Sequence, residues 1–393
     1  MSEIAWEITS LSELGTFSRG KSKHRPRNDV KLFEGGKYPL VQTGDVKAAN
    51  LYITKNDSYY NDFGLKQSKL WPAGTLCITI AANIAETAIL SYPMCFPDSI
   101  VGFNANPEKS SELFVYYFFE YIKKEIQKSA SGSIQDNINI DYLSKMRIKV
   151  PEKKYQDKIV ELLSSIDKKI LLNNQINQEL EAMAKTLYDY WFVQFDFPDQ
   201  NGKPYKSSGG KMVYNLELKR EIPEGWGVAR LDQLQIATGK RDANFGTENG
   251  KYDFWTTANS PIKADEFSFE GRAILIAGNG NFYVNFTDGK FEAYQRTYVI
   301  QSEDEKMLIF MYMACLQSAE KLRKASNGSI IKYITIGDVN NISSPYNHNV
   351  VDEFVKIYRP LIDQISKNKK QNQELNQLRD WLLPMLMNGQ VKV

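Results

Sequence analysis

The chain contains little of what catalytic and metal sites are usually made from. Its 393 residues include only two histidines and three cysteines. Acid–base catalysis and metal binding by histidine therefore have little material in His24 and His348. Cys77, Cys95 and Cys315 cannot all pair and show no Cys-x-x-Cys spacing, which argues against a zinc site and indicates a reducing compartment, the cytoplasm. We expect no metal and no cofactor.

Long apolar runs and a strong net charge are also missing. No stretch of about eighteen apolar residues is present, so the sequence predicts no membrane span. The N-terminal residues 1–14 lack the basic and apolar regions of a signal peptide. The formal net charge is only +2, so a nucleic-acid partner would have to be attracted by local basic patches. A chain of this length has room for two or more domains with their own cores.

Motifs for DNA chemistry are absent or incomplete. The chain has no Walker loop carrying a lysine. The nearest match to an adenine methyltransferase motif, at 344–346, has one proline where two are expected, which favours a turn before a helix. A loose Pro-Asp…Glu-x-Lys pattern involves Asp199, Glu217 and Lys219, but a magnesium-dependent nuclease needs such residues on a buried hairpin. We therefore predict a chain that is non-catalytic by itself, and a stand-alone nuclease stays as one alternative.

The clearest positive feature is an internal duplication. Three phrases occur twice: WEITSLSEL at 6–14 and WGVARLDQL at 226–234, GSIQDNINIDYL at 132–143 and GSIIKYITIGDV at 328–339, and NNQINQEL at 173–180 and NKKQNQEL at 368–375. Between the first and second phrases lie two blocks that are only faintly alike and contain strand-like apolar runs. Each half therefore follows one plan, a short start, a variable block, the repeated GSI passage and a long helix.

Both copies of the helix carry a heptad pattern. Apolar residues at alternating steps of four and three run from Ile159 to Trp191 and again from Phe354 to Leu386. The second run departs from the first at Arg379, where something small or apolar is expected. Helices of about 40 residues would be about 60 Å long. Each therefore needs a partner of similar length, and the other copy, running antiparallel, is the obvious one.

Two asparagines interrupt each apolar seam. In an antiparallel pairing Asn173 faces Asn372, and Asn177 faces Asn368, at the centre of the seam. Polar residues in such a position cost stability but fix the register of the pair, so we interpret the asparagines as a register lock. Two alternatives stay open, in which the asparagines lie on a solvated face or the helices form a parallel coiled coil between chains.

With this duplicated order, and the restart EIPEGWGVARLDQL at 221–234, the sequence resembles the specificity (S) subunit of type I restriction-modification systems over essentially its whole length. The resemblance implies an α+β protein with two globular target-recognition domains, separated by two long antiparallel helices and related by a pseudo-twofold axis. It also implies that each domain reads one half of a bipartite, asymmetric site in double-stranded DNA. The helices would set the spacer and dock two methyltransferase (modification) subunits for adenine-N6 methylation, and two restriction subunits can join to give an ATP-dependent endonuclease.

On this interpretation the chain has five parts. The N-terminal target-recognition domain is expected at 1–150, the first long helix at 151–197, a connector at 198–220, the C-terminal target-recognition domain at 221–346 and the second long helix at 347–393. Segments that are alike in both halves should face partners that are alike, and segments that differ should face two unlike half-sites. A scaffold that holds two partner subunits apart without touching nucleic acid is the alternative from another class.

A basic segment, SRGKSKHRPRN at 18–28, opens the first variable block. Its five cations, with no acid among them, are Arg19, Lys21, Lys23, Arg25 and Arg27. We expect a flexible loop suited to phosphates and guanine edges, with a merely solvated loop as the alternative. The equivalent point of the second half, where TGK at 238–240 repeats RGK at 19–21, offers a weaker set, Lys240, Arg241 and Asn244.

Polar residues in loops that we expect after strands form the second group of DNA-binding candidates. They are Gln42, Thr43 and Lys47 in one half, Thr256, Thr257 and Asn259 in the other, Asn279 in the Gly/Asn-rich GNGNFY, and Ser133 and Ser329 beside glycines. Asparagine and glutamine can read adenine, and threonine can touch a thymine methyl group. Ordinary turn chemistry would explain each of them singly.

Overall fold

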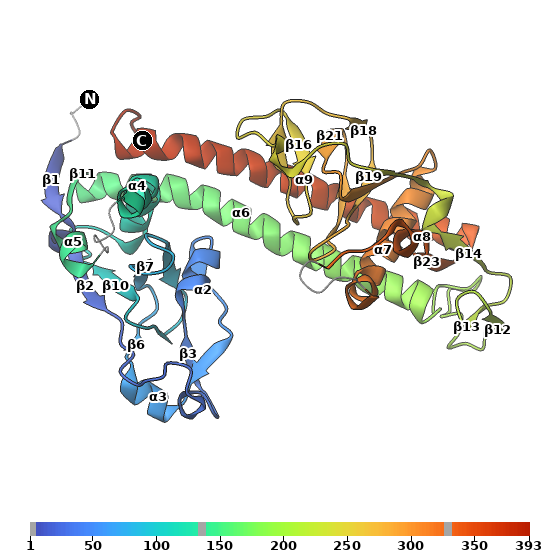
Figure 1. The fold of residues 1–393 in the computed structure, drawn as a ribbon, viewed down its shortest axis with the longest axis horizontal. Coiled ribbons are helices and arrows are strands. Elements are labelled where there is room, and N and C mark those ends of the chain that lie inside the picture. The colour runs from blue at the N-terminus through green and yellow to red at the C-terminus, as the bar shows by residue number, and fades with distance from the viewer. Residues whose placement is uncertain (1–4, 133–138, 326–331) are drawn as a thin grey trace. The chain divides into compact units, whose positions relative to one another are not determined.

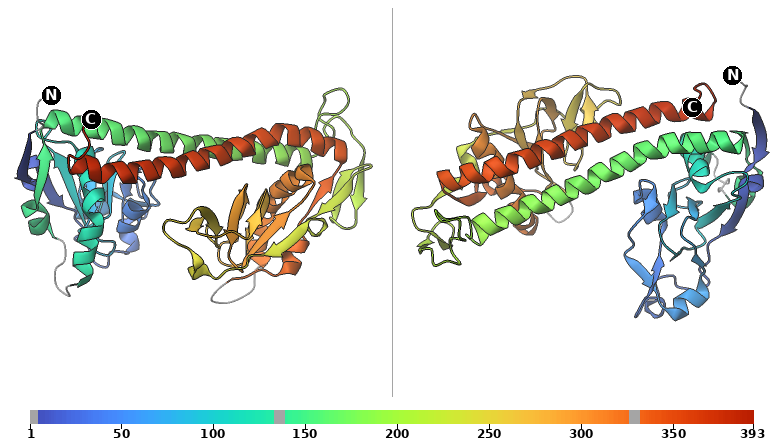
Figure 2. Two further views of the ribbon diagram at one scale, coloured as in Figure 1. Left: turned by 90° about the horizontal axis from the view of Figure 1, so that it is seen from above. Right: turned by 180° about the vertical axis from the view of Figure 1, so that it is seen from behind.

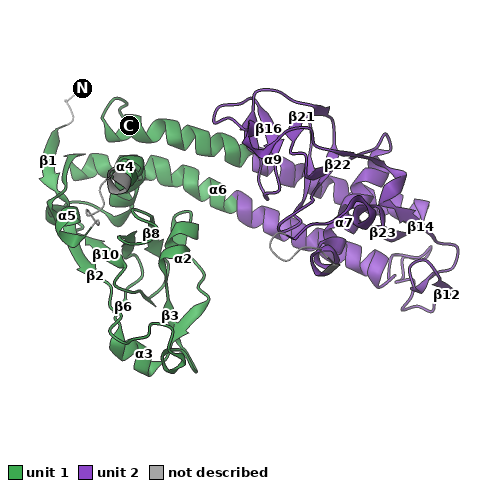
Figure 3. Cartoon of the chain, in the orientation of Figure 1, with its two compact units in different colours: residues 1–172, 371–393 green, residues 173–370 purple. Residues whose placement is uncertain are grey.

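The computed structural model describes residues 5–132, 139–325 and 332–393. The chain divides into two compact units (Figure 3). Unit 1 consists of residues 1–172 and 371–393, and unit 2 consists of residues 173–370. Each unit therefore combines one globular domain with a part of each long helix, α6 (Lys153–Tyr188) and α9 (His348–Met387) (Figure 1). Among the described residues, no helix is long and apolar enough to cross a membrane.

Unit 1 builds its domain from two sheets and a small strand pair. The strands are β1 (Trp6–Ser10), β2 (Gly15–Arg19), β3 (Tyr38–Leu40), β4 (Tyr52–Ile53), β5 (Ser58–Tyr60), β6 (Leu70–Trp71), β7 (Leu76–Thr79), β8 (Thr87–Leu90), β9 (Met94–Cys95), β10 (Ile100–Ala105) and β11 (Arg147–Pro151). The helices are α1 (Leu11–Leu14), η1 (Val30–Leu32), α2 (Thr43–Ala48), α3 (Asp62–Gln67), α4 (Glu112–Gly132) and α5 (Ile140–Lys145). The sheets have the orders β2-β10-β7-β8-β4 and β5-β3-β9-β6, and β1 pairs with β11.

Unit 2 repeats this plan. Its strands are β12 (Met212–Asn215), β13 (Arg220–Pro223), β14 (Gly227–Arg230), β15 (Gln235–Thr238), β16 (Tyr252–Trp255), β17 (Ile262–Ala264), β18 (Phe269–Glu270), β19 (Ala273–Ala277), β20 (Val284–Thr287), β21 (Lys290–Ala293), β22 (Thr297–Gln301) and β23 (Ser343–Tyr346). Its helical segments include η2 (Asp189–Val193), η3 (Leu231–Gln233), η4 (Ala243–Phe245), α7 (Glu305–Ala325) and α8 (Ile336–Asn340). The sheets have the orders β15-β22-β19-β20 and β17-β16-β21-β18, and β14 pairs with β23.

The two variable blocks share one topology although their sequences are only faintly alike. In β5-β3-β9-β6 the middle strands are parallel and the outer pairs are antiparallel. The sheet β17-β16-β21-β18 has the same directions in the same order. The first sheet of each unit also matches, β2-β10-β7-β8 with β15-β22-β19-β20. The internal repeat therefore extends through the blocks that the sequence left unmatched.

Continuous apolar runs mark the central strands because these strands are buried on both faces. In β7, Leu76 and Ile78 join the core that contains α4, whereas Cys77 joins the core around Trp71 of the second sheet. In β19, Ile274 and Leu275 likewise belong to different cores. Successive side chains of a strand point to opposite faces, so one short run supplies two hydrophobic layers in each unit.

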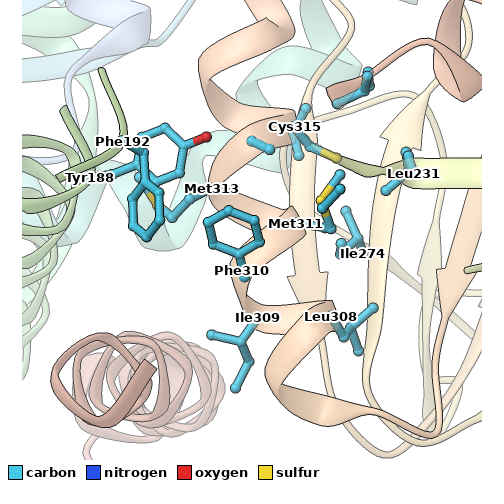
Figure 4. Packing of buried hydrophobic residues seen from close by; sticks show 14 of the residues in the cluster. Tyr188, Phe192, Leu231, Ile274, Leu308, Ile309, Phe310, Met311, Met313 and Cys315 are labelled. Atoms are coloured by element: carbon cyan, nitrogen blue, oxygen red, sulfur yellow. The ribbon is translucent and has the colours of Figure 1, made fainter. Parts of the chain in front are cut away.

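The N-terminal half of helix α7 is buried between the sheet of unit 2 and the long helices. Figure 4 shows Met311 and Cys315 lying toward Leu231 on the sheet side, while Phe310 lies toward Phe192. The rings of Phe192 and Phe310 are 4.9 Å apart. Residues 307–316 of α7 are apolar on every face and belong in such a position, whereas the C-terminal half of the helix carries exposed charged residues. This packing fixes the domain of unit 2 to its part of the helix pair.

Within each unit the long helices run antiparallel, as predicted (Figure 2). In unit 1 the N-terminal part of α6 packs with the C-terminal part of α9, through Ile159 on α6 and Leu386 on α9. In unit 2 the C-terminal end of α6 and the adjoining η2 meet the N-terminal part of α9, and the rings of Trp191 and Phe354 are 6.1 Å apart. These contacts bring together residues that the heptad pattern places face to face. The α+β fold class with two domains and long antiparallel helices is confirmed.

The end of the connector forms a hairpin with the residues that follow it, which the composition did not predict. Strands β12 and β13 pair antiparallel, from Met212 opposite Pro223 to Asn215 opposite Arg220. Asp199 closes a turn, since its Oδ1 accepts the backbone N–H groups of Asn201 and Lys203 at 2.8 Å each. Glu217 is paired with Arg230 at 3.1 Å. In the described part of the chain, no group of His, Cys, Asp and Glu side chains is arranged to hold a metal ion.

Candidate DNA interface

The basic segment of unit 1 begins at the end of strand β2. At this point the chain lies next to the turn that precedes β10. The backbone N–H of Gly20 donates to the carbonyl of Ile100 at 2.9 Å, and that of Lys21 donates to Phe96 at 3.2 Å. A Cβ atom on Gly20 would lie 2.2 Å from the carbonyl oxygen of Pro97. Only glycine permits this approach, so Gly20 fixes where the basic segment leaves the sheet.

Unit 2 uses the same anchor. Gly239 donates to the carbonyl of Thr297 at 2.9 Å, and Lys240 donates to Ala293 at 3.0 Å. A Cβ atom on Gly239 would lie 2.2 Å from the carbonyl oxygen of Tyr294. The Gly-Lys pair that occurs in both halves therefore has the same role in both units. Its backbone hydrogen bonds hold the start of the candidate DNA-binding segment.

Three arginines of the basic segment converge on Asp98, in the turn between β9 and β10. Arg27 forms an ion pair with Asp98 Oδ1 at 2.5 Å, and Arg25 lies 3.6 Å from Oδ2. Arg19 donates from Nε to the backbone carbonyl of Asp98 at 2.6 Å. The segment has no acid of its own among the cations, but the fold supplies one. We expected a flexible loop, but the structure shows a segment that is held by the backbone hydrogen bond of Gly20 and by the contacts of its arginines with Asp98.

The remaining cations of the segment point outward. Lys21 and Lys23 are exposed, and neither ammonium group has a partner among the residues that the structure describes. His24 is bonded to Asp29 at 2.8 Å, and the backbone N–H of Lys23 donates to Gln67 at 3.1 Å. Two lysines on an anchored backbone are suited to phosphate contacts, which need charge rather than exact geometry.

The segment after β3 is a short helix, which corrects our expectation of a loop. Gln42 precedes α2 as its N-cap residue, and its backbone N–H donates to Asp45 Oδ2 at 2.7 Å. Lys47 lies one turn after Thr43, so both side chains share a face of the helix. Gln42 and Lys47 are exposed and Thr43 is half-buried. The three candidates therefore lie together at one end and one face of α2.

In unit 2 the corresponding cations are less available. Lys240 is exposed, but Arg241 is held by Glu266 at 2.6 Å and by the fully buried Glu292 at 3.4 Å. The guanidinium of Arg241 also lies 4.3 Å from the ring centre of Phe245. These contacts give Arg241 a structural role in this unit and leave Lys240 and the exposed Asn244 as the freer candidates.

The position equivalent to Asp98 is occupied by Gln295. Both residues follow the carbonyl that contacts the anchoring glycine, Pro97 in unit 1 and Tyr294 in unit 2. Gln295 donates from Nε2 to Asp242 Oδ1 at 2.8 Å. In unit 1 the Asp98 carboxylate binds arginines at this point, and in unit 2 the Gln295 amide binds the Asp242 carboxylate. The same framework therefore carries different side-chain chemistry at this point in the two units.

The other candidates are divided between turn chemistry and exposed loops. The hydroxyl of Thr256 accepts the backbone N–H of Ala258 at 3.3 Å, as expected for a turn. Thr257 is half-exposed and Asn259 is exposed. Oδ1 of Asn279 is buried with no hydrogen-bond partner in the described residues. Ser133 and Ser329 lie outside the described residues.

Sequence reasoning missed Asp98, Gln295 and Glu292. Each lies more than 50 positions from the cation or acid that it holds, as the pairs Arg27–Asp98 and Arg241–Glu292 show. No local pattern marks such residues. The one sequence signal for Asp98 and Gln295 was the repeated Gly-Lys pair, because its glycine marks the point where a turn distant in sequence packs against the backbone.

This architecture, a duplicated domain with one framework and two unlike loop chemistries, is that of a protein with two specificity domains. The model of the family "Type I restriction modification DNA specificity domain" matches residues 3–182 and 223–377. The chain belongs to this family, and the resemblance found in its sequence is confirmed. It is a DNA-recognition subunit, and neither the scaffold nor the stand-alone nuclease is favoured.

Relatives of similar length support this assignment. The chain is 26% identical over 422 aligned positions to the type I restriction enzyme MjaIX specificity subunit of Methanocaldococcus jannaschii, covering 99% of this chain and 94% of the relative. It is 24% identical over 452 aligned positions to the HindI specificity subunit of Haemophilus influenzae, covering 93% and 97%. The crystal structure of a type I S subunit from M. genitalium has the same fold, with a TM-score of 0.62 and 17% identity over 98% of this chain and 97% of that one.

Proposed function

We propose that this chain reads a split, asymmetric site in double-stranded DNA for a type I restriction-modification complex. The two target-recognition domains, which we place at 1–150 and 221–346, would each bind one half-site. The observation that carries the proposal is a shared framework with unlike side-chain chemistry, Asp98 holding arginines in unit 1 and Gln295 holding Asp242 in unit 2. Two different surfaces on one framework fit two different half-sites.

The proposed contacts divide into positioning and reading. Exposed lysines such as Lys21, Lys23 and Lys240 would bind phosphates, since a compact ammonium gives affinity without sequence preference. Arginine and amide groups such as Arg27, Gln42 and Asn244 would read base edges, because they form paired hydrogen bonds to guanine or adenine. With a net charge of only +2, binding depends on these local groups.

The long helices are proposed to set the distance between half-sites and to dock two modification subunits. Parts that are alike in both halves fit two copies of one partner. Met183 on α6 and Leu378 on α9 occupy equivalent places in the repeat and are 58% and 43% exposed. Apolar side chains exposed at matching points support two equivalent docking sites. By itself the chain would carry no catalytic step, and a restriction subunit would join as a further component. The three cysteines, all free and buried, fit a cytoplasmic location.

Co-expression with a candidate modification subunit tests the proposal. Adenine methylation is mapped across the DNA of the expressing cell, and we expect one motif made of two unlike half-sites with an unread spacer of fixed length. Cells that express the modification subunit alone are the control. A continuous motif, or methylation independent of this chain, would contradict the proposal. A duplex-binding series in increasing salt gives a second readout, since phosphate contacts predict a steep loss of affinity.

A further inference from the structure

Asp98 is the one carboxylate described within ion-pair distance of Arg25 and Arg27. Its side chain is 30% exposed, and those of Arg25 and Arg27 are 55% and 50% exposed. Arg25 is also tied to its own segment, because its Nη1 donates to the carbonyls of Ser22 and His24. The guanidiniums are thus fixed at one edge and open to solvent at the other. One acid shared by several cations leaves the cluster with excess positive charge.

The arginines keep N–H donors that are not used within the described structure. A guanidinium has five N–H donors, and the ion pair of Arg27 uses Nη2 alone. Its Nε and Nη1 have no partner in the parts of the chain that the structure covers. A pair of parallel N–H donors is what the O6 and N7 edge of guanine, or two phosphate oxygens, accept. The cluster therefore combines fixed position with unused donors.

Asp98 changes what DNA binding requires of these side chains. A free arginine has several rotatable bonds, and ordering it on binding opposes association. An arginine already held by a carboxylate has lost much of that freedom beforehand, so less is lost when DNA binds. An acid beside DNA also repels phosphate. The two effects act in opposite directions, ordering favouring the correct sequence and repulsion weakening all sequences alike.

We propose that Asp98 is a positioning residue for base recognition in unit 1, a role that rests on the proposed function. Asp98 holds Arg25 and Arg27 in the geometry that discriminates one half-site, and its negative charge lowers affinity for DNA of any sequence. The Gly20 anchor supports this role, because it places the basic segment against the turn that carries Asp98. In unit 2 the side chain of the equivalent Gln295 holds Asp242 and no arginine side chain among the described contacts, so the role belongs to one half-site.

The test compares Asp98→Asn, Asp98→Glu and the wild-type chain, each full-length and co-expressed with the modification subunit. We expect Asp98→Asn to lower discrimination at one half-site by about tenfold, measured as methylation of the cognate sequence against single mismatches. The other half-site should not change. Binding to unrelated duplex should be equal or tighter, with a steeper salt dependence. Asp98→Glu keeps the charge and should recover part of the discrimination.

Asp62→Asn is the matched control, because it removes one exposed carboxylate of the same domain whose partners are Lys37 and Tyr38. It should leave both half-sites unchanged. Unchanged discrimination in Asp98→Asn would overturn the positioning role, and so would a parallel rise in affinity for all sequences. A lower thermal stability with loss of all binding would show a purely structural role. If the wild-type chain directs no split motif, the proposed function itself fails, which the wild-type map shows separately.

Discussion

Arg379 and Asp167 form an ion pair across the helix pair of unit 1, with 2.9 Å between Nη1 and Oδ1. Tyr117 on α4 donates its hydroxyl to the other carboxylate oxygen of Asp167 at 2.6 Å. Burial raises the pKa of Tyr117, and the charge and hydrogen bond of Asp167 raise it further. Burial alone would lower the pKa of Arg379, but Asp167 raises it above its usual value. The three groups join the recognition domain to both long helices.

Unit 2 fills the equivalent place without any charge. Ile362 and Ala184 stand where unit 1 has the aspartate and the arginine, and they are 3% and 2% exposed. Arg379, the one departure from the repeated heptad pattern, is therefore explained by a polar cluster present in only one copy. The same position of the repeat is therefore charged in unit 1 and apolar in unit 2.

The first prediction follows from this difference. Arg379→Ala leaves Asp167 buried without its cation, and removing one partner of a buried pair costs about 3–5 kcal/mol. Asp167 is 11% exposed and Arg379 27% exposed, so solvent screening places the expected loss at the lower end of this range. The free energy of unfolding in urea measures it. A loss within error of zero would show that solvent already screens the pair.

The matched control copies unit 2 into unit 1. Asp167→Ile and Arg379→Ala introduce the two residues that the other copy uses, and Tyr117→Phe, made together with them, removes the hydroxyl that donated to Asp167. Replacing a buried ionic cluster by apolar residues of suitable shape is often neutral or stabilising. We therefore expect the triple variant to be at least as stable as the wild type. A triple variant less stable than Arg379→Ala alone would contradict this account.

The long helices and their pairing could be predicted because their signals are local and repeated. Residues such as Ile159 and Leu386 recur at fixed steps, and one copy confirms the pattern of the other. The contact between Trp191 and Phe354 follows directly from that register. Domain topology could not be predicted in this way, because strands such as β9 (Met94–Cys95) are too short to show a period.

The candidate interface was predictable only in part. The basic segment was visible because its cations are adjacent in sequence, but the ion pair of Arg27 with Asp98 spans 71 positions. The sequence predicted a loop at α2, since six residues with glycine in second place, Gly44, give no helical period. Its one local signal was the spacing of Gln42 and Asp45, which cap the helix.

The second prediction concerns the anchoring glycines. Gly20→Ala places a methyl group 2.2 Å from a backbone carbonyl that cannot move freely, and overpacking of this kind costs about 1–3 kcal/mol. Gly239→Ala should have the same effect in unit 2. Gly44→Ala is the control, because nothing lies within 4 Å of its Cβ position and alanine favours the helix. Thermal unfolding measures all three variants. If all three variants are equally stable, the backbone around Gly20 and Gly239 moves to accommodate the added methyl group, and the prediction is wrong.

The third prediction is a pH dependence at the start of unit 1. The backbone N–H of Ser10 and the hydroxyl of Thr9 donate to Glu13, and these bonds lower the pKa of Glu13 from 4.5 to about 2. A depressed carboxyl pKa stabilises the fold above pH 4.5 and loses this contribution as the pH falls toward 2. Glu13→Gln should therefore be less stable than the wild type at neutral pH, with a difference that shrinks over this acidic range.

Unit 2 supplies the reciprocal variant, because Gln233 accepts the backbone N–H of Arg230 at 3.1 Å in the equivalent position. Gln233→Glu should introduce the same acid-dependent stabilisation. Urea unfolding at a series of pH values measures both variants. A difference between wild type and Glu13→Gln that stays constant from neutral pH down to pH 2 would contradict the role given to the Glu13 carboxylate.

The fourth prediction concerns the asparagines of the seam. Asn368 donates from Nδ2 to Asn177 Oδ1 at 2.8 Å, and both are buried. Asn177→Leu alone leaves a buried N–H without its acceptor, at a cost of about 1–3 kcal/mol. With Asn368→Leu added, an apolar pair restores stability but no longer specifies the register. Urea unfolding of both single variants and the double measures their coupling, and purely additive effects would contradict a shared role. The pairing of Asn173 with Asn372, also buried, stays a prediction.

The last prediction tests the helices as a ruler. One heptad inserted after Asn174 and one after Lys370 would add the same length to both helices and keep the seam in register on each side. Seven residues add about 10 Å of helix, which corresponds to about three base pairs of DNA. We expect the methylated motif to keep both half-sites and to gain about three base pairs of spacer, read by methylation mapping. A heptad inserted after Asn174 alone puts the seam out of step and should abolish methylation. If the doubly lengthened chain methylates sites with the wild-type spacer, the helices do not set the distance between half-sites.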